Sequence, residues 1–235
     1  MLKPAIRYAL QDDWVSRILA GGIFTATSVI LLPAFTLLGY FLRVLEETVN
    51  GVPHPPDFEG YLSMTKDGFV AFIILGLYTI SPLVLFVLTI YGLVQINVIY
   101  NLSMVEFSLI GFIILLPVTI ISLTAYYIVP VAMTNYAIKH EFRSAFQFSN
   151  IIKIAGTKTY IIGSILPVML IIISSVLTIT VSTTGIGVVI VPFIQFFFQM
   201  IIIRLFAITY RKSETSPTIT VNKLMRMTDV SRLYS

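Results

Sequence analysis

Long hydrophobic stretches without a charged residue alternate with short polar segments along this chain. Four of them contain 25, 38, 32 and 45 residues and cover positions 18–42, 68–105, 107–138 and 159–203. An α-helix needs roughly 20 apolar residues to cross a hydrocarbon core about 30 Å thick. Each stretch is therefore long enough to form at least one membrane-spanning helix.

The number of spans depends on how the two longest stretches divide. The stretch 159–203 can hold two helices, and the Ser-Thr-Thr-Gly-Ile-Gly sequence at 182–187 is typical of a turn between them. The stretch 68–105 becomes polar in its second part, so it predicts one span and a loop. The expected fold is an all-α, polytopic transmembrane helical bundle with interfacial amphipathic segments. About five proline-kinked spans are predicted, near residues 18–44, 69–94, 106–138, 160–182 and 187–210. Residues 1–212 are expected to form a single integral membrane domain, and 213–235 a polar, basic tail.

Lys and Arg residues, which collect on the cytoplasmic side of membrane proteins, predict the orientation. With five spans, 12 of the 15 cations share a side when the carboxyl terminus is cytoplasmic and the amino terminus lies outside. The three cations before residue 18 then lie on the opposite side, which conflicts with the rule. An alternative stays open, in which the first hydrophobic segment dips into the membrane and returns at Gly21, Gly22 and Pro33. That arrangement places every Lys and Arg inside.

Composition strengthens the membrane assignment. Hydrophobic residues make up 57% of the chain, charged residues 11%, and the mean hydropathy is +0.95. Soluble domains carry about 25% charged residues. The chain has no cysteine, which excludes disulfides, zinc–thiolate sites and iron–sulfur clusters. The net charge of +4 fits orientation and contact with anionic lipid, and the basic residues do not interleave with aromatics as in a nucleic-acid module. We therefore expect a cell-membrane, multi-pass protein that contacts the lipid bilayer and no nucleic acid.

Charged residues are absent from the middle of the predicted spans. Arg43, Glu106 and Arg204 lie near span ends, where long side chains reach the headgroups. Proton pumps and ion-coupled carriers usually bury an ionisable group near the bilayer midplane. The sequence therefore disfavours an ion-coupled carrier.

Three amides are the remaining polar candidates inside the spans. Gln195 and Gln199 are four residues apart and share one helix face, and Asn135 lies in another span. Two interpretations stay open: these residues line a polar path, or they form hydrogen bonds between helices.

The segment 46–69 is the most distinctive loop, because three prolines stiffen a run of aromatic and acidic residues. We expect a short helix along the membrane surface before Gly68 opens the second span. The candidate contacts to a partner or an interface are Pro55, Pro56, Asp57, Phe58 and Tyr61.

This region also resembles a known family. Gly39-Tyr40, Arg43, Pro55-Pro56-Asp57-Phe58 and Asp67-Gly68 are similar to the hallmark region of an archaeal membrane family, domain of unknown function 4013. Gly60-Tyr61 stands where that family often has a tryptophan. The resemblance implies a multi-pass membrane protein, and it implies no activity and no functional residues.

Motifs of enzyme chemistry are missing from the sequence. It has no nucleophile elbow, Walker loop, dinucleotide fingerprint or paired-histidine metal motif, so we expect no enzyme and no cofactor. The leading hypothesis is a non-enzymatic structural, anchoring or assembly component with a protein partner or a homo-oligomeric state. The alternative is a transporter or channel for a small or apolar solute. A lipid-modifying enzyme is a third hypothesis, and it needs His54 to converge with the loop carboxylates.

Overall fold

The structure is a computed structural model that describes residues 2–215, and all regular secondary structure in this part of the chain is helical. Its contacts form two compact units, residues 2–72 with 130–215 (the first unit) and residues 73–129 (the second unit). The helices are α1 (Leu2–Ala9), α2 (Trp14–Ala26), α3 (Leu31–Asn50), α4 (Tyr61–Tyr100), α5 (Met104–Lys139), the 3-10 helix η1 (Phe142–Phe146), α6 (Phe148–Ala155), α7 (Lys158–Ser182) and α8 (Gly187–Glu214).

Four of these helices are long and apolar enough to cross a membrane: α4, α5, α7 and α8. They contain the last four spans expected from the sequence. The prediction of an all-helical membrane protein is therefore confirmed, and the expected number of spans is about right.

The expected first span, 18–44, is the exception, because it is two helices rather than one. α2 ends at Ala26 and α3 begins at Leu31. Pro33 lies in the first turn of α3, where its missing N–H is tolerated, but its ring prevents the helix from continuing backwards. Thr27 and Ser28 donate side-chain hydrogen bonds to preceding carbonyls of α2, at 2.7 Å each. At 13 residues α2 is about 20 Å long, too short for an ordinary span.

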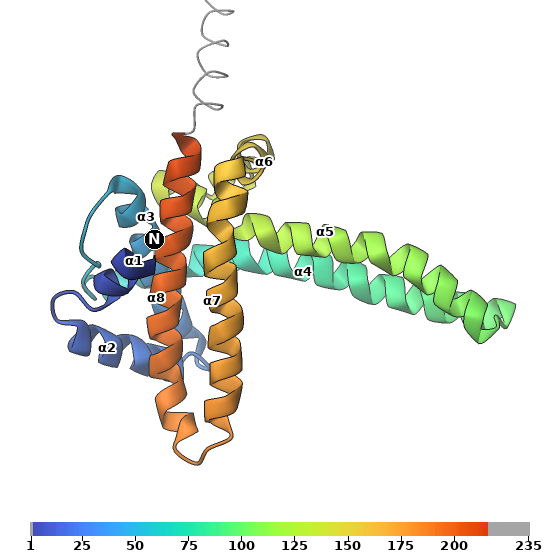
Figure 1. The fold of residues 1–235 in the computed structure, drawn as a ribbon, viewed down its shortest axis with the longest axis horizontal. Helices are drawn as coiled ribbons and strands as arrows, with labels where there is room; N and C mark the ends of the chain where they lie inside the picture. The colour runs from blue at the N-terminus through green and yellow to red at the C-terminus, as the bar shows by residue number, and fades with distance from the viewer. Residues whose placement is uncertain (1, 216–235) are drawn as a thin grey trace, which may run out of the picture. The chain divides into compact units, whose positions relative to one another are not determined.

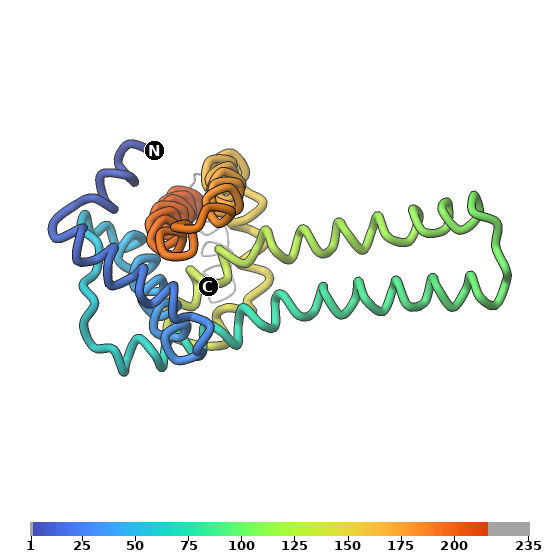
Figure 2. Tube along the Cα trace, turned by 90° about the horizontal axis from the view of Figure 1, so that it is seen from below, coloured from blue at the N-terminus to red at the C-terminus, as the bar shows by residue number. Residues whose placement is uncertain are grey.

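Helix α8 forms the centre of the first unit. It contacts α7, α2, α3 and α1, and Figures 1 and 2 show α7 and α8 side by side. Gly21 and Gly22 of α2 lie directly against the rings of Phe196 and Phe193 of α8. A side chain at either glycine would displace a phenylalanine, so small residues set this close helix packing.

A second close approach joins α3 to the first turns of α4. A Cβ on Gly39 would collide with the backbone oxygen of Met64, and one on Gly68 with the backbone oxygen of Phe35. The two backbones are thus in direct contact, as small residues permit between membrane helices. Gly68 lies inside α4, which begins at Tyr61, so the expected separate surface helix in this segment is wrong.

The connections between helices use local capping. Gly51 caps the C-terminus of α3 with a left-handed φ of 87°, and the Val52 N–H donates to the Glu47 carbonyl at 2.9 Å. Before α5, the Ser103 N–H donates to the Glu106 carboxylate and the Glu106 N–H donates to the Ser103 hydroxyl, which is a capping box. Between α5 and α7 the chain forms the two short helices η1 and α6.

The second unit, residues 73–129, consists of the C-terminal part of α4 and the N-terminal part of α5, which run in opposite directions and are joined by residues 101–103 (Figure 2). Its side chains are mostly exposed. Among residues 104–130 of α5 only Gly111 and Val118 are buried, and in the most apolar 18-residue stretch of α4 22% are buried. This unit therefore presents its hydrophobic surface outward.

Candidate functional site

A half-buried arginine in α8 is the centre of the most unusual polar arrangement in the first unit. The guanidinium carbon of Arg204 lies 3.4 Å from the centroid of the Tyr8 ring, which α1 supplies. Its Nη1 donates to the Thr48 hydroxyl of α3 at 3.3 Å. Its Nε is buried without a hydrogen-bond partner. Three separate elements therefore fix this guanidinium, which stacks on an aromatic face as arginine prefers.

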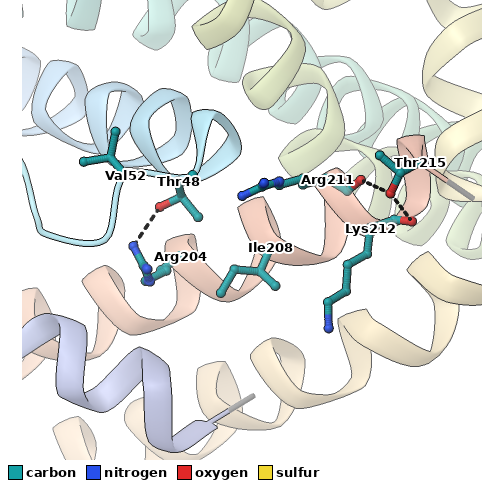
Figure 3. Close-up of a pocket in the computed structure, with 8 residues that line it drawn as sticks. Thr48, Val52, Arg204, Ile208, Arg211, Lys212 and Thr215 are labelled. Atoms are coloured by element: carbon teal, nitrogen blue, oxygen red, sulfur yellow. Dashed lines mark hydrogen bonds between the residues drawn. The ribbon is translucent and has the colours of Figure 1, made fainter.

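A cavity of about 220 Å³ lies between α3 and α8 beside Arg204. The α8 wall is one helical stripe, because its residues are spaced four, seven, eight and eleven positions after Arg204. Figure 3 shows the guanidinium groups of Arg204 and Arg211 on the side of α8 that faces Thr48, with Lys212 extending away. The lining residues are Thr48, Gly51, Val52, Arg204, Ile208, Arg211, Lys212 and Thr215.

A second cavity, of about 290 Å³, shares Arg204 and lies against α1. Lys3 and Arg7 are one helical turn apart and line it together with Tyr8 and Pro53. The two cavities thus carry five cations and no carboxylate among their lining residues. Within residues 2–215 the structure contains one ion pair, between Glu46 and His140 at 3.2 Å. None of the five cations therefore forms a salt bridge with a residue in this range.

Two carboxylates are next to lining residues in the chain, Glu214 before Thr215 and Glu47 before Thr48. The Glu47 Oε2 is buried without a partner. Burial raises the pKa of this carboxyl above its usual value, and His54 opposes that shift. Burial also raises the pKa of Tyr8, against the effect of Arg204, so the phenol that supports the guanidinium is neutral at physiological pH. The positive charge of Arg204 is therefore not cancelled by its aromatic platform.

Of the three amides that the sequence singles out, Asn135 has the most ordered surroundings. Its Oδ1 accepts a 2.6 Å hydrogen bond from the Tyr210 hydroxyl, and its carbonyl accepts one from Ser144 at 3.1 Å. It lines a cavity of about 550 Å³ with Lys139, Gln147, Lys153, Tyr210 and Glu214 among others.

The two glutamines lie on α8, whereas Asn135 belongs to α5. Gln199 has a buried Oε1 without a partner, and Gln195 is partly exposed. Gln199 precedes Tyr210, the α8 partner of Asn135, by eleven residues, which is about 16 Å along the helix. The cavity at Asn135 does not include either glutamine among its lining residues. Asn135 is therefore not brought together with the glutamines.

The five candidate contacts in the loop divide into two groups. Pro55 and Pro56 are buried, and the Phe58 ring stacks on Tyr40 with centroids 4.0 Å apart and planes 2° apart. Asp57 and Tyr61 are exposed. Only the last two present most of their side chain to an incoming molecule, whereas the other three pack against the helices of their own unit.

Sequence reasoning missed the cluster around Arg204, which it interpreted as a residue reaching the headgroups from a span end. The stripe of cations at 204, 211 and 212 was a visible signal, but their convergence with Lys3, Arg7 and Tyr8 depends on α1 packing against α8. Among residues 2–215 no group of three or more His, Asp or Glu side chains is placed to hold a metal ion.

A comparison with protein families gives one match. The family described as "Protein of unknown function (DUF4013)" matches residues 23–183, which is more than half of the chain. No curated protein and no solved structure matches it. The chain therefore belongs to the DUF4013 family. The matched segment contains α3, the loop and Asn135, and it ends before α8 and the Arg204 stripe.

Proposed function

We propose that this DUF4013 protein is a non-enzymatic component of the cell membrane that anchors or assembles a protein partner, or a second copy of itself, in the lipid bilayer. The proposal rests mainly on the exposed hydrophobic surface of the second unit. Among residues 104–130 of α5 only Gly111 and Val118 are buried, so most of the surface of this helix segment is available to lipid and to other helices. A helix that is hydrophobic all round needs such an environment.

The proposed topology has four spans, with both termini on the cytoplasmic side. Four candidate helices in place of five return the chain to the side from which it started. The connections on the far side are residues 101–103 and 183–186, and neither contains Lys or Arg. All 15 cations then lie on one side, which satisfies the positive-inside rule better than the five-span arrangement. α2 and the start of α3 take the role of the segment that dips in and returns.

The alternative function, transport of a small or apolar solute, requires a continuous path. Asn135, Gln195 and Gln199 are the amides available to line it, but the roughly 16 Å between Gln199 and the partner of Asn135 leaves a gap. This spacing makes the anchoring role the better supported of the two.

Photo-crosslinking tests the proposed role. A photoreactive residue replaces Leu116 or Leu123 of α5, which are 46% and 63% exposed, and the control position is Leu205 of α8, which is 1% exposed. In native membranes we expect protein adducts of discrete mass from the two α5 positions and not from Leu205. Adducts with lipid alone from both α5 positions contradict assembly. Solute flux into liposomes containing the purified protein, above that of empty liposomes, would favour the transporter instead.

A further inference from the structure

The cavity between α3 and α8 has the properties of an anion site. Two arginines, one lysine and two threonine hydroxyls line it, and none of its lining residues is a carboxylate. Positive residues at the end of a membrane helix also satisfy the orientation rule and the helix dipole without binding anything. Those roles depend on the location of the charge and do not require a guanidinium held in one orientation, so they do not account for the fixed position of Arg204.

Arg204 is held in one orientation before any ligand arrives. The Tyr8 ring covers one face of its guanidinium at 3.4 Å, and Thr48 accepts from only one of its nitrogens. A guanidinium has five N–H donors in a planar fork, so most of its donors remain for a ligand. Because the side chain is already ordered, a ligand that accepts these hydrogen bonds does not need to order it at an entropic cost.

Arg211 adds a second guanidinium to the same space. It follows Arg204 by seven residues, which is about two turns and returns it to the same helix face. Its Nη1 lies 2.8 Å from the position that a Cβ on Gly51 would occupy. The glycine that caps α3 therefore also leaves room for this guanidinium beside Thr48.

The depth of the cavity along α8 corresponds to the headgroup region. Arg204 follows the first residue of α8, Gly187, by 17 residues, or about 26 Å of helix. The hydrocarbon core is about 30 Å thick, so a helix that enters the bilayer near Gly187 brings Arg204 close to the opposite edge of the core, from which its long side chain reaches the headgroups. In the four-span topology this is the layer where cytoplasmic anionic lipids lie.

From this geometry we propose that the cavity binds a phosphate group, with Arg204, Arg211 and Thr48 as its main contacts and Lys212 at its rim. Arginine pairs donate to phosphate oxygens in short, charge-assisted hydrogen bonds, and a planar fork matches that acceptor better than a point charge does. A volume of about 220 Å³ exceeds the roughly 30 Å³ of one water several-fold, so a phosphate group fits with part of its hydration. The phosphate belongs either to a lipid headgroup or to a soluble molecule. The inference does not rest on the proposed anchoring role.

The test uses the full chain in phosphatidylcholine nanodiscs and measures the rise in apparent Tm on titration. Arg211→Gln is the principal variant because this side chain is exposed and its loss leaves the packing intact. Arg143→Gln is the matched control, an exposed arginine of η1 that does not line the cavity. Arg204→Lys keeps the charge and removes the planar fork. The ligands are phosphatidic acid in the disc, inorganic phosphate in solution, and cholesteryl hemisuccinate as an anionic lipid without phosphate.

We expect phosphatidic acid to stabilise the wild type and Arg143→Gln equally. Loss of one charge-assisted contact should weaken the response of Arg211→Gln by about 10- to 100-fold in the midpoint of the titration. If inorganic phosphate gives this Arg211-dependent response and phosphatidic acid does not, the phosphate comes from a soluble molecule. The proposal is overturned if Arg211→Gln responds like Arg143→Gln, or if cholesteryl hemisuccinate stabilises the wild type as well as phosphatidic acid does.

Discussion

Replacement of Phe58 by alanine tests whether the proline-rich loop is part of the core or a free surface for partners. In the structure its ring stacks on Tyr40 with centroids 4.0 Å apart, and it also lies near Phe24 and Phe196, at 5.7 and 6.0 Å. Tyr40 and Phe196 are both fully buried. The loop is thus attached to the first unit through this ring, and Phe58→Ala should destabilise the folded protein.

The magnitude follows from burial and stacking. Truncation of a fully buried phenylalanine costs about 3–5 kcal/mol, and a half-buried ring should lose roughly half of that. The stacked pair adds about 0.5–1.5 kcal/mol beyond area burial. We therefore expect a loss of about 2–4 kcal/mol, which corresponds to a fall in apparent Tm of roughly 4–16 °C for a protein of this size.

The assay is thermal unfolding in nanodiscs, with Tyr61→Ala as the control. Tyr61 is 53% exposed in the same segment, and its truncation should change the apparent Tm far less. A double-mutant cycle with Phe58→Leu and Tyr40→Leu isolates the ring–ring contribution. Equal Tm values for Phe58→Ala and the wild type, or no coupling in the cycle, would refute the assignment of Phe58 to the core.

Three further changes have defined outcomes. Gly68→Leu should force α4 away from the Phe35 backbone and cost about 3 kcal/mol or more, measured as loss of folded protein by size exclusion. Gly111→Leu is the control and should be tolerated, because a Cβ added at Gly111 has no neighbouring atom within 4 Å. Glu47→Gln should raise stability above about pH 4.5 and have little effect below it. A carboxyl whose pKa is raised in the folded state stabilises the fold when protonated, and that contribution is lost as the pH rises through the folded pKa. Tm measured against pH checks this, and a Tm gain that does not depend on pH contradicts it. Tyr210→Phe should leave the buried Asn135 oxygen without its donor and cost about 1–3 kcal/mol, and an unchanged Tm would show that water replaces the hydroxyl.

Local patterns in the sequence predicted the helices well where each helix is an uninterrupted apolar run. The segments 106–138, 160–182 and 187–210 agree closely with α5, α7 and α8 because charged and turn residues mark their ends. The first hydrophobic segment, 18–44, does not form the single helix that its hydropathy predicts. Pro33 and the polar run before it stop α2, and a hydrophobicity pattern counts apolar residues without registering where the backbone can continue.

For the candidate site residues, too, the sequence does not predict the contacts that depend on helix packing. Loop residues that look exposed by composition, such as Phe58, are held inside because the Tyr40 ring lies opposite, and that contact joins residues 18 positions apart. The separation between Asn135 and the glutamines could be found only once Tyr210 was known to be the partner of Asn135. Side-chain partners of this kind depend on how helices pack, which sequence spacing within one helix does not specify.

The sequence by itself determined that this is a multi-helical membrane protein of the DUF4013 family, because solvation of long apolar runs and of their flanking cations is a property of each segment alone. The tertiary structure decided which cations come together. Arg204 and Arg211 share a face by helix periodicity, but Tyr8 and Thr48 reach them only because α1 and α3 both pack on α8. A fixed guanidinium beside an open cavity is therefore a consequence of helix packing, since it requires three segments that are distant along the chain to meet at one point.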